Sequence, residues 1–196
     1  MKVQKLQDLA GYCDITEQSI QNIQVKNIFS GKGSRAKNQY IKKIAEEVLI
    51  ESYKRKDGYQ HDEVGILVDI NSLKELMTVK GYWNYNMQTS LININNPQYQ
   101  NFMDIGDSRE YVFIHNHPNN STVSYSDICE FMFNEALACI VAVGNNGVMH
   151  YAYKTSEKSY VSLTRRMVNI SRNTKKSNIL YRDIIKNYDK YNLRIV

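Results

Sequence analysis

The sequence has 196 residues, 42% of them hydrophobic, which is enough for one sizeable core or for one core with a small appendage. Its 9 Gly and 2 Pro exclude collagen-like and Pro/Gly-rich disordered chains. Residues 1–62 hold 11 Lys/Arg and 8 Asp/Glu, residues 63–153 hold 3 and 9, and residues 154–196 hold 11 and 3. An acidic middle segment between basic flanks is unsuited to holding a polyphosphate along its own surface.

The cysteines and the N-terminus indicate the compartment. Cys13, Cys129 and Cys139 are odd in number and form no C-x-x-C pair, so neither a disulfide framework nor a cysteine zinc site is expected. The first residues lack the apolar stretch of a signal peptide, and no apolar run approaches the roughly 20 residues of a membrane span. We therefore expect a cytoplasmic protein with reduced thiols and no membrane partner.

The first sixty residues are predicted to be mainly helical. Apolar residues recur near helical spacing over 6–12, and residues 14–17 resemble a capping start for a helix over 18–28. Residues 40–53 predict a clearer amphipathic helix, with its apolar side chains on one face. Residues 1–60 are therefore expected to form a helical N-terminal extension.

From residue 63 the pattern changes to strands rich in β-branched and aromatic residues. The expected strands are 63–70, 76–83, 90–94, 111–114, 139–143 and 148–153. A helix is expected over 124–137, and residues 101–110 fit either a helix or a loop. Residues 61–154 therefore predict one α/β domain in which at least one helix covers a sheet, followed by a basic helical extension over 155–196.

The motif with the clearest chemistry is H-N-H-P at 115–118, directly after an apolar strand. Side chains two residues apart on a strand point the same way, so His115 and His117 can present two imidazoles to one point. Asp127 comes three residues after Ser124, the expected N-cap of the next helix, so its carboxylate is expected near the end of the same strand. Two imidazoles and one carboxylate are a typical catalytic zinc set with one coordination position left for water.

A zinc-activated water also needs a base, and Glu63 is the candidate because a carboxylate is an odd choice at the start of a buried strand. Asp62 is the neighbouring alternative, and His61 is expected to be a bystander. The hydroxyl of Ser124 could hydrogen-bond an oxyanion on the substrate. Taken singly, each residue has an ordinary structural interpretation, and residues 124–127 alone would indicate a capping box. Their combination favours a metal site.

These residues resemble the JAMM/MPN+ (JAB) metalloprotease motif, in which a Glu precedes H-x-H-P and then S-x-x-D. The H-N-H-P wording is most similar to bacterial RadC-like and phage- or toxin-associated JAB domains, and the resemblance covers residues 62–153. It implies a mixed β-sheet flanked by helices, a cytidine-deaminase-like architecture. It also implies one Zn²⁺ held by His115, His117 and Asp127, with Glu63 as general acid/base and Ser124 as transition-state stabiliser.

The resemblance implies a zinc-dependent hydrolase of a peptide or isopeptide bond, acting on a protein or peptide such as a ubiquitin-like tail. Two alternatives stay open. The basic flanks fit a RadC-like protein that associates with nucleic acid, and the fold also occurs as a non-catalytic MPN scaffold. The basic tail could also pack on the acidic domain or mediate a dimer.

Overall fold

The computed structural model describes residues 13–57, 60–84, 89–92, 96–106, 109–118, 120–156, 160–170 and 173–196. Within these ranges, seven strands form one sheet in the order β5-β4-β3-β6-β7-β8-β9. These strands are β3 (Val64–Asp69), β4 (Lys74–Asn84), β5 (Thr89–Ile92), β6 (Tyr111–His117), β7 (Leu137–Gly144), β8 (Met149–Lys154) and β9 (Leu193–Ile195). Strands β6 and β7 are parallel and the other neighbours are antiparallel, so the sheet is mixed, as predicted.

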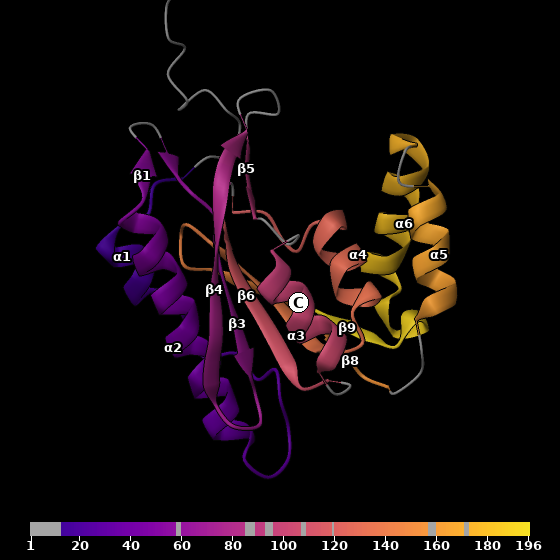
Figure 1. The fold of residues 1–196 in the computed structure, drawn as a ribbon, viewed down its shortest axis with the longest axis horizontal. Helices are drawn as coiled ribbons and strands as arrows, with labels where there is room; N and C mark the ends of the chain where they lie inside the picture. Colours follow the sequence, from indigo (N-terminus) through magenta and orange to yellow (C-terminus); the bar gives the residue numbers. More distant parts are fainter. Residues whose placement is uncertain are drawn as a thin grey trace, which may run out of the picture.

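Helices cover both faces of the sheet (Figure 1). The helices are α1 (Glu17–Gln21), α2 (Ser34–Tyr53), α3 (Pro97–Ile105), α4 (Tyr125–Phe133), α5 (Val161–Ile170) and α6 (Thr174–Lys186). A short 3-10 helix, η2 (Tyr188–Tyr191), follows α6, and β1 (Lys56–Asp57) pairs with β2 (Gln60–His61) outside the main sheet. Helices α1 and α2 lie on one face, and α3 to α6 lie on the other.

The two faces have separate hydrophobic cores, and β6 contributes to both. Val112 and Ile114 pack with the α2 face, whereas Phe113 packs with the face that α3 and α4 cover. Burial on both sides explains why β6 and β7 are continuous apolar runs rather than alternating ones. The same alternation continues to the end of β6, so His115 and His117 share the Phe113 face and Asn116 shares the Ile114 face.

The N-terminal helices differ in length from the prediction. The helix expected over 18–28 ends at Gln21, because Ile23 and Ile28 are buried in the α2-side core by a non-helical chain. Asn38 of α2 fixes that chain by accepting hydrogen bonds from the N–H groups of Ile28 (3.2 Å) and Phe29 (2.9 Å). Helix α2 begins at Ser34, earlier than the predicted residue 40. The helix expected over 6–12 lies outside the described residues.

The segment predicted as a helix or a loop over 101–110 is helical in its first part. Helix α3 begins at Pro97, where the Asn96 side chain accepts hydrogen bonds from the first helical N–H groups. Of the strand predicted over 90–94, the structure describes Thr89–Ile92 as β5, and 93–94 lie outside the described residues.

The prediction of a helical extension over 155–196 is only partly correct, because the chain ends in a strand after α5, α6 and η2. Asn192 has a left-handed backbone (φ 53°) that ends η2, and the following strand β9 pairs with the edge of β8. Leu193 is then fully buried in the core that Met167 of α5 and Ile184 of α6 also share. The basic tail therefore packs on the α/β domain, and the boundaries at 60/61 and 154/155 stay predictions. In the described part of the chain, no helix is both long and apolar enough to cross a membrane.

Candidate metal centre

His115 and His117 end β6 on the face that α4 covers. Their side chains are almost wholly buried, at 3% and 7% exposure, and their Nε2 atoms lie 2.9 Å apart. The rings meet edge to face, with centroids 4.7 Å apart. The strand alternation therefore brings both imidazoles to one point, as the H-x-H spacing predicts.

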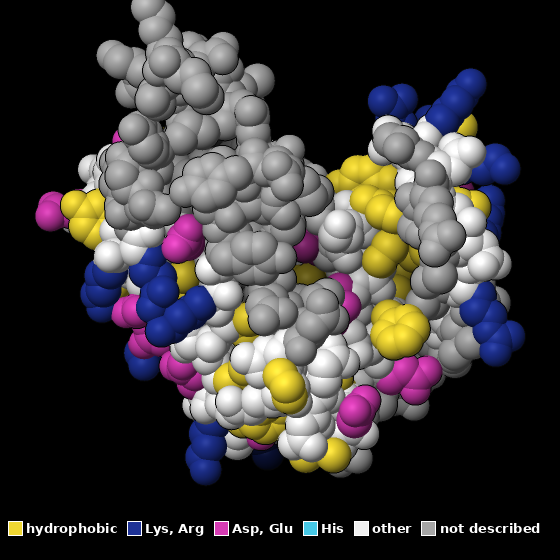
Figure 2. Space-filling model, turned by 45° about the horizontal axis from the view of Figure 1, so that its top comes forward, with side chains coloured by type: hydrophobic (Ala, Val, Ile, Leu, Met, Phe, Trp, Pro, Cys, Tyr) yellow, Lys and Arg dark blue, Asp and Glu magenta, His cyan; other side chains and the backbone are white. Residues whose placement is uncertain are grey.

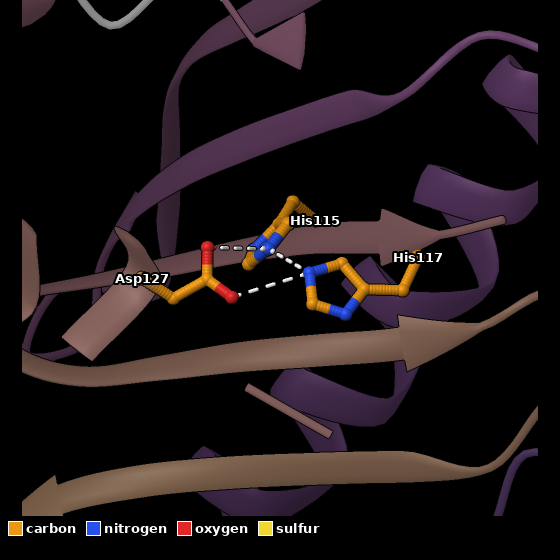
Figure 3. A group of neighbouring side chains, drawn as sticks. All are labelled: His115, His117 and Asp127. Atoms are coloured by element: carbon orange, nitrogen blue, oxygen red, sulfur yellow. Dashed lines mark hydrogen bonds and ion pairs between the residues drawn. The ribbon is translucent and has the colours of Figure 1, made fainter. Parts of the chain in front are cut away.

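Asp127 reaches the same point from the first turn of α4 (Figure 3). Its Oδ1 lies 3.2 Å from Nε2 of His115, and its Oδ2 lies 3.2 Å from Nε2 of His117. A capping box holds the carboxylate: the Ser124 N–H donates to Oδ2 (2.5 Å), and the Ser124 Oγ accepts from the Asp127 N–H (3.1 Å). The three residues form one buried group that could hold a metal ion.

The charges of this group stabilise one another. Burial by itself would raise the pKa of Asp127, but the charges and hydrogen bonds of His115 and His117 lower it well below its usual value. Burial would likewise lower the pKa of His117, but the hydrogen bond and charge of Asp127, together with the charge of Glu63, raise it. Asp127 is therefore an ionised carboxylate at neutral pH, as a metal ligand must be.

Ser121 orients the ring of His117. The Nδ1 of His117 lies 3.1 Å from the backbone carbonyl oxygen of Ser121 and 3.0 Å from its hydroxyl. A proton on Nδ1 donated to that carbonyl leaves the lone pair on Nε2, which faces Asp127 and His115. The sequence analysis missed Ser121, because the loop that folds it back under His117 carries no motif.

Packing, rather than a hydrogen bond to its Nδ1, orients the ring of His115. Its ring is stacked on Phe113, with centroids 5.5 Å apart and planes 18° apart, and Tyr99 packs edge-on against Phe113 at 5.5 Å. The buried Nδ1 of His115 has no hydrogen-bond partner among the described residues. Nε2 is therefore the His115 nitrogen that faces the group, as a metal ligand would require.

Glu63 precedes β3 and faces the same group. Gly65 pairs with His115 in the antiparallel register of β3 and β6, so extending this register by two residues places Glu63 opposite His117. Desolvation of its carboxyl group raises the pKa of Glu63; the charge of His117 opposes this shift, the charge of Asp127 adds to it, and the net pKa is about 8. A carboxyl group that titrates near neutral pH is suited to exchanging protons.

The other predicted site residues have less direct placements. Ser124 lies at the site through its capping box with Asp127, which confirms the capping interpretation of residues 124–127. Asp62 lies next to Glu63, and its backbone carbonyl accepts a hydrogen bond from Ser52. The side chain of His61 lies outside the described residues.

The cysteines take no part in the metal group. Cys13, Cys129 and Cys139 are all free thiols, and Cys139 is wholly buried in the α2-side core.

Comparison of the chain with models of protein families, with curated proteins and with solved structures finds no match. The functional assignment therefore rests on the residues of the site.

Proposed function

We propose that this protein is a zinc-dependent hydrolase of the JAMM type that cleaves a peptide or isopeptide bond. The observation that carries this proposal is the convergence of His115, His117 and Asp127 beside Glu63, whose pKa is raised to about 8. A binding scaffold would need neither the three ligands nor a carboxyl group that titrates near neutral pH.

The donor set favours zinc over other common divalent ions. Two imidazole nitrogens and one carboxylate oxygen are a typical catalytic zinc set, whereas magnesium and calcium prefer oxygen ligands. The neighbouring donor atoms lie 2.9 to 3.2 Å apart. The two 3.2 Å distances involve different oxygens of Asp127, and one ligand atom from each of the three residues lies within 4.8 Å of the others. The edge of a zinc tetrahedron is about 3.3 Å, so the three side chains are near enough to share one ion. Bound zinc would lower the pKa of a water molecule and polarise the substrate carbonyl.

Glu63 would move the proton. In the metal-free protein, a pKa near 8 keeps its carboxyl group mostly protonated at neutral pH. A bound cation would favour the carboxylate, which could accept the proton of the attacking water and later donate it to the leaving amine. The negative charge of Asp127 contributes to the raised pKa and therefore to the basicity of the Glu63 carboxylate.

Ser124 would serve in two ways. Its N–H donates to Oδ2 of Asp127, which orients the carboxylate. Its hydroxyl oxygen accepts the Asp127 N–H, so the hydroxyl proton can be donated to an oxyanion on the substrate. The substrate class, including a ubiquitin-like tail, follows from the motif resemblance alone.

The test is metal analysis together with an activity screen on the full chain. We expect about one zinc per chain by elemental analysis, and hydrolysis of at least one member of a panel of peptide-linked and isopeptide-linked fluorogenic substrates. A chelator should abolish hydrolysis and added zinc should restore it. A wild-type protein that binds no zinc at micromolar concentration, or that binds zinc but hydrolyses no member of the panel, would contradict the proposal.

An anionic partner is the second candidate, favoured by the surface of the C-terminal helices. Figure 2 shows Lys and Arg side chains along the outer margin of this part of the molecule. The exposed basic residues there are Arg165, Arg166, Lys175, Lys176, Arg182 and Lys186. If they bind nucleic acid, fluorescence anisotropy should show binding to a DNA duplex that weakens with added salt and with the double substitution K175E/R182E. Binding that persists in this variant would exclude the surface.

A further inference from the structure

Asn116, the residue between the two histidines, is fully buried on the opposite face of β6. All its side-chain atoms that can form hydrogen bonds do so. Its Oδ1 accepts from the N–H of Val64 (2.7 Å), and its Nδ2 donates to Ser52 Oγ and to Asn145 Oδ1, both at 3.1 Å. A buried amide that satisfies three groups from three separate segments holds those segments in register.

Ser52, in the last turn of α2, completes this arrangement. It too is fully buried, and its hydroxyl donates to the backbone carbonyl of Asp62 at 2.5 Å while accepting from Asn116. Asp62 and Val64 are the residues on either side of Glu63. The carbonyl of Glu63 itself accepts from the N–H of Gly81 in β4 at 2.7 Å.

We propose that Ser52 and Asn116 are positioning residues that fix Glu63 relative to the metal ligands. This inference rests on the proposed function. Because Asn116 stands between His115 and His117 in one strand, any shift of the ligands is transmitted to both neighbours of Glu63. A displacement of about 1 Å at a reacting group can cost roughly 10²-fold in rate, so this connection matters to turnover.

Packing alone does not explain why a polar residue, Asn116, stands at this buried position of β6. The neighbouring residues on the same face of β6, Val112 and Ile114, are apolar and fully buried, as a core strand requires. A buried amide costs free energy unless each of its groups is paired, so an apolar residue would serve stability as well. The Asn116 side chain instead accepts the N–H of Val64, the first residue of β3, directly after Glu63.

The same network gives the N-terminal segment a part in the site. Asn145, in the turn between β7 and β8, accepts from Asn116 and donates to the backbone carbonyl of Cys13 at 2.8 Å. Its N–H also donates to the carbonyl of His117 at 3.2 Å. Helix α2 and the chain at Cys13 therefore support the strand ends that carry the ligands and the base.

The test compares Ser52→Ala and Asn116→Leu with the control Asn38→Leu. Asn38 is a matched control because, like Asn116, it is a buried amide. It lies on α2 and makes three hydrogen bonds with the backbone of Ile28 and Phe29. We expect both site variants to bind one zinc per chain. Their kcat should fall by about 10- to 100-fold with KM within about threefold of wild type. The control should keep the wild-type kcat.

Amide hydrogen exchange gives a measurement that does not depend on activity. In Asn116→Leu, the Val64 N–H should exchange at least about 10-fold faster relative to that of Ile66, whereas Asn116→Asp keeps the acceptor oxygen and should retain the protection. Unchanged Val64 exchange in Asn116→Leu, or an unchanged kcat in both site variants, would overturn the inference. A wild type without zinc or turnover would refute the proposed function, and the Val64 measurement on the same protein would still decide the hydrogen-bonding part.

Discussion

Glu63 and Lys154 are both desolvated by the fold, and the two pKa values shift in opposite directions because one group is an acid and the other a base. Desolvation raises the pKa of Glu63 to about 8 and lowers the pKa of Lys154 to about 7. Lys154 is 2% exposed, its Nζ donates to the backbone carbonyl of Asn134 at 2.6 Å, and the ring of Phe131 lies 4.7 Å from the ammonium. Glu63 remains partly exposed and faces His117 and Asp127.

The difference shows why a perturbed pKa does not identify a functional residue by itself. Lys154 donates to the backbone carbonyl of Asn134, the cap at the C-terminal end of α4, and it is buried against the rings of Phe131 and Tyr160. Glu63 has a similar shift but lies beside three potential metal ligands, two of which, His117 and Asp127, act on its charge. The chemistry of the neighbours, rather than the size of the shift, makes Glu63 the candidate functional group of the two.

The largest expected effect is a loss of kcat on substitution of Glu63 that substitution of Lys154 does not cause. Glu63→Gln removes the proton carrier but no metal ligand, so kcat should fall by about 10²- to 10⁴-fold while zinc stays bound. Lys154→Met keeps the size of a buried side chain and should leave kcat within about threefold of wild type. Steady-state kinetics and elemental analysis of the same preparations check both results.

The neighbouring carboxylate provides the control for this experiment. Asp62→Asn should retain most of the wild-type kcat, because the structure ties Asp62 to Ser52 through its backbone carbonyl, which the substitution preserves. If Asp62→Asn lost activity and Glu63→Gln kept it, the base would be Asp62. Glu63 would then be, like Lys154, a desolvated group without a catalytic role.

The next effect concerns metal affinity. His117→Ala removes a ligand and should weaken zinc binding by more than about 100-fold, a larger loss than that expected for a group that only orients a ligand. His150→Ala, on β8, is the matched control, because this partly buried histidine lies outside the metal group and should keep wild-type affinity. Competition with a chromophoric chelator measures both. Equal affinity of the two variants would exclude His117 as a ligand.

Local sequence patterns were sufficient to bring the three potential metal ligands together. The period of two along β6 places His115 and His117 on one face, and the S-x-x-D start of a helix places Asp127 in the first turn of α4. The same alternation shows that Asn116 must face the other way. Its partners could not be predicted, because Ser52 and Val64 lie 64 and 52 residues away in the chain.

The ends of the sheet were also beyond local patterns. Strand β9 has three residues and pairs with β8, and α5, α6 and η2 lie between the two strands in the sequence. Its formation therefore depends on the edge of β8 and on the burial of Leu193. Short segments of this kind have no period of their own. The long central strands were predicted because burial on both faces selects continuous apolar runs.

The pH dependence of stability would sharpen the comparison for Lys154. Between pH 7 and its ordinary pKa of 10.5, the unfolded chain binds more protons at Lys154 than the folded protein does, so the free energy of unfolding rises with pH across this range. Lys154→Met should remove this rise, which we expect to be about 2 to 4 kcal/mol. Urea unfolding at pH 7 and pH 10 measures it. The same rise in both proteins would contradict the desolvation of Lys154.

Glu63 should show the opposite slope in the metal-free protein. Between its ordinary pKa of 4.5 and about 8, the folded protein binds more protons at Glu63 than the unfolded chain does, so the free energy of unfolding falls as pH rises. Each pKa unit corresponds to about 1.4 kcal/mol, and partial exposure reduces the cost, so Glu63→Gln should gain about 1 to 3 kcal/mol over wild type between pH 5 and pH 8. If the difference in free energy of unfolding between the two proteins stayed constant over this range, Glu63 would not be desolvated. Of the two residues compared, only Lys154 could then still have a pKa shifted by burial.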